Sequence, residues 1–190
     1  MSRSALIRQI PNALTLLNAL MGISAIWVIV ALDFPLTVYV AVALIAIGAV
    51  VDFLDGYCAR RLGAESEMGK QLDSFSDLIT FGIAPVALLH HVAVSGQPVV
   101  IAASFAFLIA GIFRLARHNL CGAGCHFIGL PITAAGMLLA LYCLMYALFA
   151  SSIFLATDGF ILRVAVTTII VCLLAGLMVS CFKIKRIKQL

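Results

Sequence analysis

Charged side chains are scarce in this chain of 190 residues, where they make up 11% of the total and only eight residues are acidic. Hydrophobic residues make up 64%, and the mean hydropathy is +1.20. Soluble domains have roughly a quarter of their residues charged. A soluble fold of this length could not bury so much apolar surface, so the scarcity of charge indicates a membrane protein.

Alternation of polar and apolar residues is also missing, which excludes a closed β-barrel, the other structure that spans a bilayer. The chain instead holds long runs without a charged residue: 13–32, 36–51, 78–94, 98–113, 127–150 and 164–182. A spanning helix needs roughly 20 apolar residues, and the two shorter runs can extend into the polar residues that follow them. We therefore expect an all-α integral membrane protein of one domain, residues 1–190, with six transmembrane helices in one bundle.

Basic residues gather on one side of the predicted membrane. If the six runs cross the membrane in turn, eleven of the twelve basic residues lie on one side of it, and Arg163 alone lies on the other. By the positive-inside rule, both termini and residues 52–77 face the cytoplasm. The net charge of +4 then reflects orientation and contact with membrane lipids. It does not indicate a nucleic-acid partner.

Six of the eight acidic residues lie within residues 52–77, between the second and third runs. Asp52 and Asp55 are three apart, and Asp73 and Asp77 are four apart, so each pair shares one face of a helix. In an antiparallel hairpin the four carboxylates would converge. Two such charges about 4 Å apart repel by about 4 kcal/mol at an effective dielectric of 20. This repulsion calls for a bound cation or for protons that stay on the carboxylates, and of the two we predict that the four aspartates bind a divalent metal.

The acidic segment has the spacing D-x2-D-G-x2-A-R-x8-G-x3-D-x3-D, whose fixed positions are Asp52, Asp55, Gly56, Ala59, Arg60, Gly69, Asp73 and Asp77. It resembles the signature of the CDP-alcohol phosphatidyltransferases. The resemblance implies a homodimer in the cytoplasmic membrane and two divalent ions, Mg²⁺ or Mn²⁺, held by the aspartates at the cytoplasmic face. It also implies transfer of a phosphatidyl group from a CDP-lipid to an alcohol, with release of CMP.

Three further parts of the chain look like the membrane-type phosphatidylserine synthases of that family: IPNALTLLNALMG (10–22), LDSFSDLITFGIAP (72–85), and FRLARHN with FIGLPITAAG (113–119 and 127–136). They imply CDP-diacylglycerol as donor and L-serine as acceptor. Two positions depart from the pattern, His118 where an aromatic residue is more usual and Thr133 where a second proline is common. We expect neither to touch a catalytic role.

Two alternatives stay open at this point. One is a related transferase that uses glycerol phosphate, inositol phosphate or a second lipid as its acceptor. The other is an ion transporter that uses its membrane aspartates, although transporter sites lie near the bilayer midplane. The acidic residues here are predicted at helix ends.

Polar and small residues in the matched stretches are candidates for substrate contacts. For the CDP-lipid we expect Asn12, Thr15, Asn18, Asp52, Gly56, Ala59, Arg60 and Gly69. For serine we expect Ser76, Thr80, Arg114, Arg117 and Asn119, because a guanidinium can hold a carboxylate in bidentate geometry. The structural alternatives are hydroxyls that bond to the helix backbone and arginines that anchor a helix at the membrane surface.

The serine hydroxyl needs a proton acceptor before it can attack. No histidine lies within residues 52–77, so we expect a carboxylate, and Asp77 is the candidate catalytic base. A separate cluster of Cys121, Cys125 and His126 could bind zinc with a fourth ligand from elsewhere, or could be incidental.

We predict from the distribution of basic residues that both termini are cytoplasmic. A C-terminal fusion to a reporter that works only inside the cell should be active. A fusion to a reporter that works only outside the membrane should be silent, and the reverse pattern would contradict the orientation.

Overall fold

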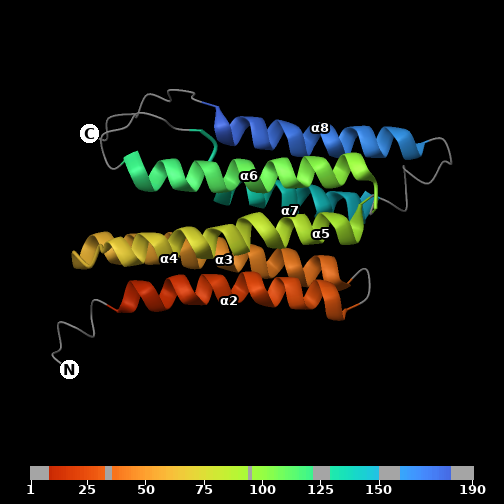
Figure 1. The fold of residues 1–190 in the computed structure, drawn as a ribbon. Coiled ribbons are helices and arrows are strands. Elements are labelled where there is room, and N and C mark those ends of the chain that lie inside the picture. The colour runs from red at the N-terminus through yellow and green to blue at the C-terminus, as the bar shows by residue number, and fades with distance from the viewer. Residues whose placement is uncertain (1–8, 33–35, 94–95, 122–128, 150–158, 181–190) are drawn as a thin grey trace, which may run out of the picture.

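The structure, a computed structural model, describes residues 9–32, 36–93, 96–121, 129–149 and 159–180. These ranges are helical and contain no strand (Figure 1). In chain order the elements are α2 (Ile10–Ala31), α3 (Leu36–Leu62), α4 (Glu67–Asp77), η1 (Leu78–Ile83), α5 (Ala84–Val92), α6 (Pro98–Cys121), α7 (Ile132–Phe149) and α8 (Phe160–Val179).

Among the described residues, six helical segments are long and apolar enough to cross a membrane. The third of them joins α4, η1 and α5 into one helix over Glu67–Val92. The two short apolar runs extend into polar residues as expected, because α3 continues to Leu62 and α6 to Cys121. The predicted all-α, multi-pass fold is confirmed. The side of the membrane on which the termini lie stays a prediction.

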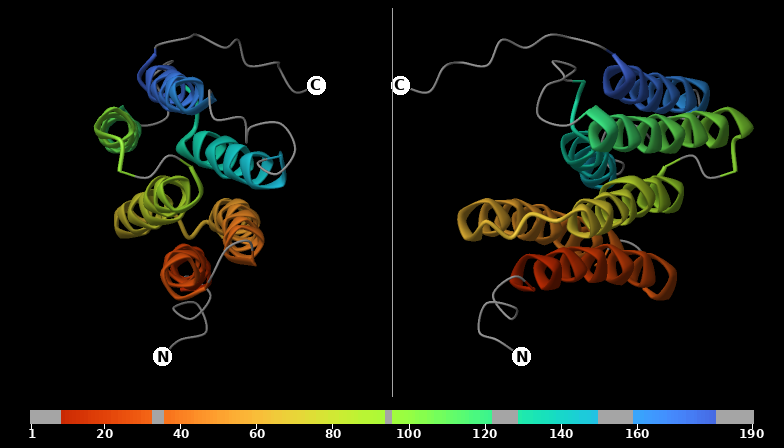
Figure 2. Two further views of the ribbon diagram at one scale, coloured as in Figure 1. Left: turned by 90° about the vertical axis from the view of Figure 1, so that its right-hand side faces the viewer. Right: turned by 60° about the vertical axis from the view of Figure 1, so that its left-hand side comes forward.

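The helices run side by side, and α2 begins and α8 ends at the end of the bundle where α4 begins (Figure 1). Viewed along the bundle, α2, α3 and the α4–α5 segment form one group, and α6 and α8 form another (Figure 2). α2 packs closely on both α3 and α4, whereas α3 and α4 pack only sparsely on each other. The hairpin of α3 and α4, which carries the four aspartates, is therefore held together through α2 and not by direct packing of α3 on α4.

The third span changes its helix type directly after Asp77. Residues Leu78–Ile83 form a π-helix, a rare arrangement with a wider turn. Pro85 follows it and has no N–H for the carbonyl of Phe81, four residues earlier. A π-helical turn lets the helix continue past this missing donor, so the sequence explains why the change occurs here.

Two glycines allow neighbouring helices to lie directly against η1. A Cβ atom at Gly136 of α7 would overlap the backbone of Phe81, and one at Gly22 of α2 would lie 2.8 Å from the Cα atom of Thr80. Small residues at such contacts let membrane helices approach closely. η1 is thus held between α2 and α7, which fixes the position of Asp77 at its N-terminal end.

We predict that Gly136→Ala lowers the melting temperature of the detergent-solubilised protein, because overpacking typically costs about 1–3 kcal/mol. Gly176→Ala in α8 is the matched control, since an added Cβ atom there meets nothing within 4 Å. The control should melt at the wild-type temperature or slightly above it. Equal melting temperatures for wild type and Gly136→Ala would contradict the close packing of α7 on η1.

Candidate metal and substrate site

The four aspartates converge at one end of the bundle, as the sequence predicts. One carboxylate oxygen each from Asp52, Asp55 and Asp73 lies within 4.8 Å of the other two. The Asp77 carboxyl lies close enough to Asp52 and Asp73 for their charges to interact, and so joins the cluster. Asp55 is 4% exposed and Asp77 is 7% exposed. Water therefore screens these charges only weakly.

The cluster offers the hard oxygen ligands of a divalent cation. Among the described residues, Asp55 Oδ2 and Asp77 Oδ1 are buried without a hydrogen-bond partner. Two oxygens bound to one Mg²⁺ at about 2.1 Å each are at most about 4.2 Å apart. The observed separations of up to 4.8 Å would need only a small side-chain rotation to close on an ion. The acidic triad could therefore bind a metal.

A cavity of about 240 Å³ opens beside Asp55 and Asp73. It is lined by most of the residues predicted to contact the CDP-lipid: Asn12, Thr15, Gly56, Ala59, Arg60 and Gly69. These residues come from α2, α3 and α4, so the cavity depends on the packing of α2 against both other helices. Their roles as CDP-lipid ligands stay predictions.

Local geometry gives a reason for the two glycines of the cavity. A Cβ atom on Gly56 would lie 3.3 Å from a guanidinium nitrogen of Arg60, so glycine leaves room for Arg60 to fold back over α3. A Cβ atom on Gly69 would lie 3.2 Å from Asn12 Oδ1. The Gly69 N–H also donates to Ser66 Oγ at 3.0 Å, which caps the N-terminus of α4.

Asn18 does not line the cavity that Asn12 and Thr15 line. It is 0% exposed and is not among the residues that line the cavity. Both atoms of its amide are buried without a partner in the described part of the chain. It lies where α2 meets Gly48, one helical turn before Asp52. The structure thus places Asn18 outside the cavity lining, and its contact with the CDP-lipid stays a prediction.

The two hydroxyls predicted to bind serine are engaged within the fold. Ser76 Oγ donates to the carbonyl of Thr15 at 2.9 Å, and Thr80 Oγ1 donates to the carbonyl of Asn18 at 2.9 Å. Both bonds join the third span to α2 on either side of Asp77. The geometry gives these hydroxyls a structural role and does not support direct contact with serine.

Arg114 and Arg117 lie on the same helix but contact different neighbours. Arg114 is partly buried and lies close enough to Asp77 for their charges to interact. Arg117 Nη2 donates to the carbonyl of Val179 at 3.2 Å. That carbonyl belongs to the last turn of α8, where helical partners are missing. Arg114 therefore interacts with the acid cluster through its charge.

Two residues that sequence reasoning set apart from catalysis lie at this site. His118 lines the cavity. Thr133, in the first turn of α7, lies near Asp52. Next to His118, Asn119 Nδ2 donates to Ser74 Oγ at 2.9 Å, which ties α6 to α4. The signal that could have found His118 and Thr133 was their departure from an otherwise matched pattern.

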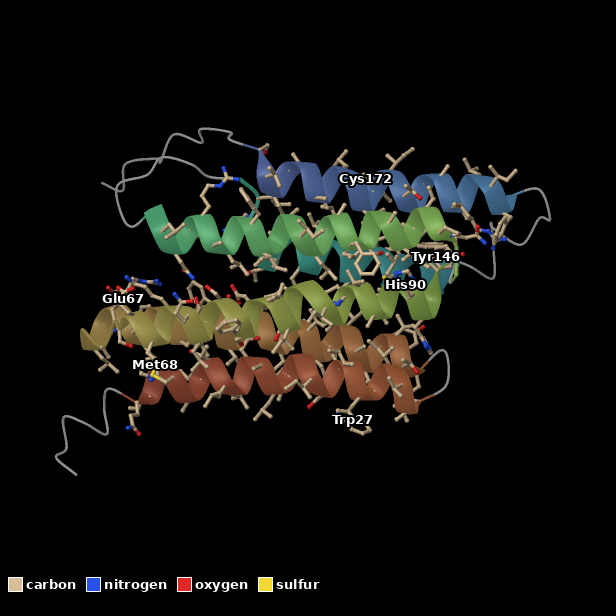
Figure 3. All side chains as sticks on the ribbon, in the orientation of Figure 1. Trp27, Glu67, Met68, His90, Tyr146 and Cys172 are labelled. Carbon is tan, nitrogen blue, oxygen red and sulfur yellow. The ribbon has the colours of Figure 1, made fainter. Side chains whose placement is uncertain are left out.

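Figure 3 places His90 at the opposite end of the bundle from Glu67, the first residue of α4. His90 Nε2 lies 3.1 Å from Ser104 Oγ of α6. This histidine is remote from the aspartates, as the sequence predicts. The candidate zinc ligands, the side chains of Cys121, Cys125 and His126, lie outside what the structure describes.

Comparison with known families agrees with this site. The family model for CDP-alcohol phosphatidyltransferase matches residues 8–180. The chain belongs to the CDP-alcohol phosphatidyltransferase family. Membership in this family makes the protein a transferase, and the acid cluster at the end of its membrane helices is the part that carries the signature.

Several relatives are similar over about two thirds of this chain or more. CDP-diacylglycerol–serine O-phosphatidyltransferase of Bacillus subtilis (strain 168) is 38% identical over 139 residues, 72% of this chain and 76% of the relative. The protein of that name from Methanocaldococcus jannaschii is 35% identical over 134 residues, 70% of this chain and 60% of the relative. Archaetidylserine synthase of Methanothermobacter thermautotrophicus is 37% identical over 131 residues, 67% of this chain and 54% of the relative. The matched part thus spans less than two thirds of both archaeal relatives.

We predict that Asp52→Asn, Asp55→Asn or Asp73→Asn weakens metal binding and turnover by more than about 100-fold. Each variant removes a direct metal ligand, whereas loss of a group that only orients a ligand typically costs about 10–100-fold. Mn²⁺ titration and CMP release by the purified variants measure both effects. Glu67→Gln is the control, since its exposed carboxylate pairs with Lys70 at 3.0 Å. Full turnover of the wild type in excess chelator would contradict the metal site.

Proposed function

We propose that this protein is a CDP-diacylglycerol–serine O-phosphatidyltransferase, which forms phosphatidylserine and CMP. The family and the names of its relatives support the proposal. The observation that carries it is the placement of two different sets of side chains around one acid cluster. The cavity with Arg60 adjoins Asp55 and Asp73, whereas Arg114 does not line the cavity and interacts with Asp77 through its charge.

On the donor side, the cavity would hold the CDP head group. Arg60 supplies a positive charge for the diphosphate, while Asn12 and Thr15 offer polar contacts. Gly56 lets the ligand approach the backbone closely. Asp52, Asp55, Asp73 and Asp77 would hold two Mg²⁺ or Mn²⁺ ions. When bound, these ions neutralise the diphosphate and stabilise the departing CMP.

On the acceptor side, Asp77 takes the proton of the serine hydroxyl while the serine oxygen bonds to the phosphorus that carries diacylglycerol. The bond from that phosphorus to the bridging oxygen breaks, and CMP leaves with this oxygen. Arg114 would hold the serine carboxylate through its planar fork of N–H donors. Ser76 and Thr80 would act indirectly, because their bonds to α2 hold Asp77 in place.

We also propose that the protein lies in the cytoplasmic membrane with this site facing the cytoplasm. Eleven of its twelve basic residues fall on the predicted cytoplasmic side, which supports this orientation. Serine and CMP would then exchange with the cytoplasm while the lipid chains stay in the bilayer. The family resemblance supports a homodimer.

The test is a transfer assay on purified protein in detergent micelles, with CDP-diacylglycerol, radiolabelled serine and Mg²⁺ or Mn²⁺. We expect labelled phosphatidylserine and an equal amount of CMP. Transfer to glycerol phosphate or inositol phosphate, with none to serine, would assign the protein to another branch of the family. Metal-ion uptake into vesicles without CMP release would indicate a transporter.

We predict that Arg114→Lys raises the KM for serine by about tenfold or more, because a hydrogen bond between charged groups is worth about 1.5–3 kcal/mol and lysine lacks the bidentate fork. The KM for CDP-diacylglycerol should change less. Arg117→Lys is the matched control, since Arg117 bonds to the end of α8. Equal rises in both KM values, or a larger effect at Arg117, would contradict a serine-binding role for Arg114.

We predict that Asp77→Asn keeps CDP-diacylglycerol binding and loses serine transfer, with kcat lowered by about 10²–10⁴-fold as for loss of a general base. Equilibrium binding of the CDP-lipid and CMP release report the two steps separately. A near-normal kcat, or complete loss of CDP-lipid binding, would show that Asp77 is not primarily the base.

A further inference from the structure

The cavity beside Asp55 and Asp73 receives one side chain from a distant part of the sequence. All of its lining residues but one lie between Pro11 and Asp73, in α2, α3, α4 and the turn that joins α3 to α4. The exception is His118, in the last turn of α6. The fourth span therefore contributes to this cavity through His118.

The chain on both sides of His118 is tied to other helices. Asn119 Nδ2 donates to the hydroxyl of Ser74 in α4 at 2.9 Å, and Ser74 directly follows Asp73. Arg117 Nη2 donates to a backbone carbonyl in the last turn of α8 at 3.2 Å. Because α4 and α8 hold the residues next to it, the backbone of His118 has a defined place beside the cavity.

The imidazole of His118 is not used by the fold. It is exposed, and it has no hydrogen-bond or ion-pair partner among the described residues. Lys70, another basic residue of the cavity lining, instead pairs with Glu67 at 3.0 Å. In either protonation state an imidazole carries at least one N–H donor. His118 thus offers the cavity a donor that is available to a ligand.

The ligand that suits this donor carries negatively charged oxygen atoms. His118 lines the same cavity as Arg60, and a charged oxygen makes a stronger hydrogen bond than a neutral one. Both a nucleotide phosphate and the serine carboxylate have this chemistry. The phosphate is favoured, because Arg114, one turn before His118 on the same face of α6, does not line the cavity.

We propose that His118 is a nucleotide-binding residue that donates a ring N–H to the phosphate that leaves with CMP. The inference rests on the proposed function, since it takes the cavity as the site of the CDP head group. Arg60 of α3 and His118 of α6 then bind the nucleotide from two helices. The contact is made to the substrate and to the product alike, so its loss raises KM and leaves kcat nearly unchanged.

The test measures the Kd for CMP by titration calorimetry on the purified full-length protein, with Mn²⁺ at one saturating concentration. His118→Phe keeps a flat ring and loses the N–H donor, whereas His118→Gln keeps a donor. We expect the phenylalanine variant to bind CMP about tenfold or more weakly, and the glutamine variant to stay within a few-fold of wild type. His91→Phe is the matched control, because His91 is exposed and follows His90 at the opposite end of the bundle (Figure 3).

Cytidine, which lacks the phosphate, identifies the part of the nucleotide that is contacted. We expect wild type and His118→Phe to bind cytidine equally. Wild-type affinity for CMP in His118→Phe, with weaker binding of CMP and cytidine in His118→Gln, would show a ring that stacks on the base and would overturn the proposal. Equal losses in the two variants, or no loss in either, would also overturn it.

Transfer kinetics distinguish the phosphate from the serine carboxylate. We expect His118→Phe to raise the KM for CDP-diacylglycerol more than the KM for serine. A rise in the KM for serine alone, with an unchanged Kd for CMP, would place His118 on the acceptor side and contradict the proposal. Because His118 is exposed, its variants should melt at the wild-type temperature.

The outcomes also separate this inference from the proposed function. Weaker CMP binding in His118→Phe, together with a wild type that transfers nothing to serine, would support His118 and reject serine as the acceptor. Serine transfer by the wild type, with unchanged CMP binding in His118→Phe, would reject His118 alone. A wild type that binds no CMP would reject the cavity as the nucleotide site and the role of His118 with it.

Discussion

The mutual repulsion of four carboxylates in a small, poorly hydrated volume is the constraint on which the rest of this structure depends. Asp55 and Asp77 are almost completely buried, and each has a carboxylate oxygen without a partner among the described residues. Each pair of charges about 4 Å apart costs about 4 kcal/mol at an effective dielectric of 20. Whole domains are stable by only about 5–15 kcal/mol. The bundle must therefore provide both a rigid frame for the acids and a place for positive charge.

The frame is built from close backbone contacts and not from bulky side chains. Gly22 and Gly136 let α2 and α7 approach η1, and the hydroxyls of Ser76 and Thr80 bond across to α2. Apolar side chains give little drive for association between helices in lipid, so small residues and interhelical hydrogen bonds take that part. These contacts surround Asp77, so the same interactions that hold the third span also fix the proposed base.

In the proposed function, the cluster divides the site into a donor side and an acceptor side because different helices reach it. α2, α3 and α4, together with His118 of α6, line the cavity beside Asp55 and Asp73, and α6 also carries Arg114, whose charge interacts with Asp77. Thr133 of α7 lies near Asp52. Arg117, only three residues from Arg114, instead bonds to the end of α8. Positions three apart on a helix differ by about 60° around its axis, which here is enough to send two equivalent side chains to different neighbours.

The sequence by itself determined the membrane class, the approximate spans and the set of acidic residues, because hydropathy and helical spacing are local properties of the chain. It also indicated most of the cavity lining. Asn12 and Thr15 are at helical spacing on the first span, and Gly56 and Arg60 are positions of the signature next to Asp55. Only the tertiary structure decided that Asn18 is buried outside the cavity lining, that Ser76 and Thr80 bond to α2, and that Arg114 interacts with Asp77 through its charge while Arg117 bonds to the end of α8. The same holds for His118 and Thr133. Each of these outcomes depends on which helices are neighbours and how they are rotated, and these are set by packing between residues far apart in the chain.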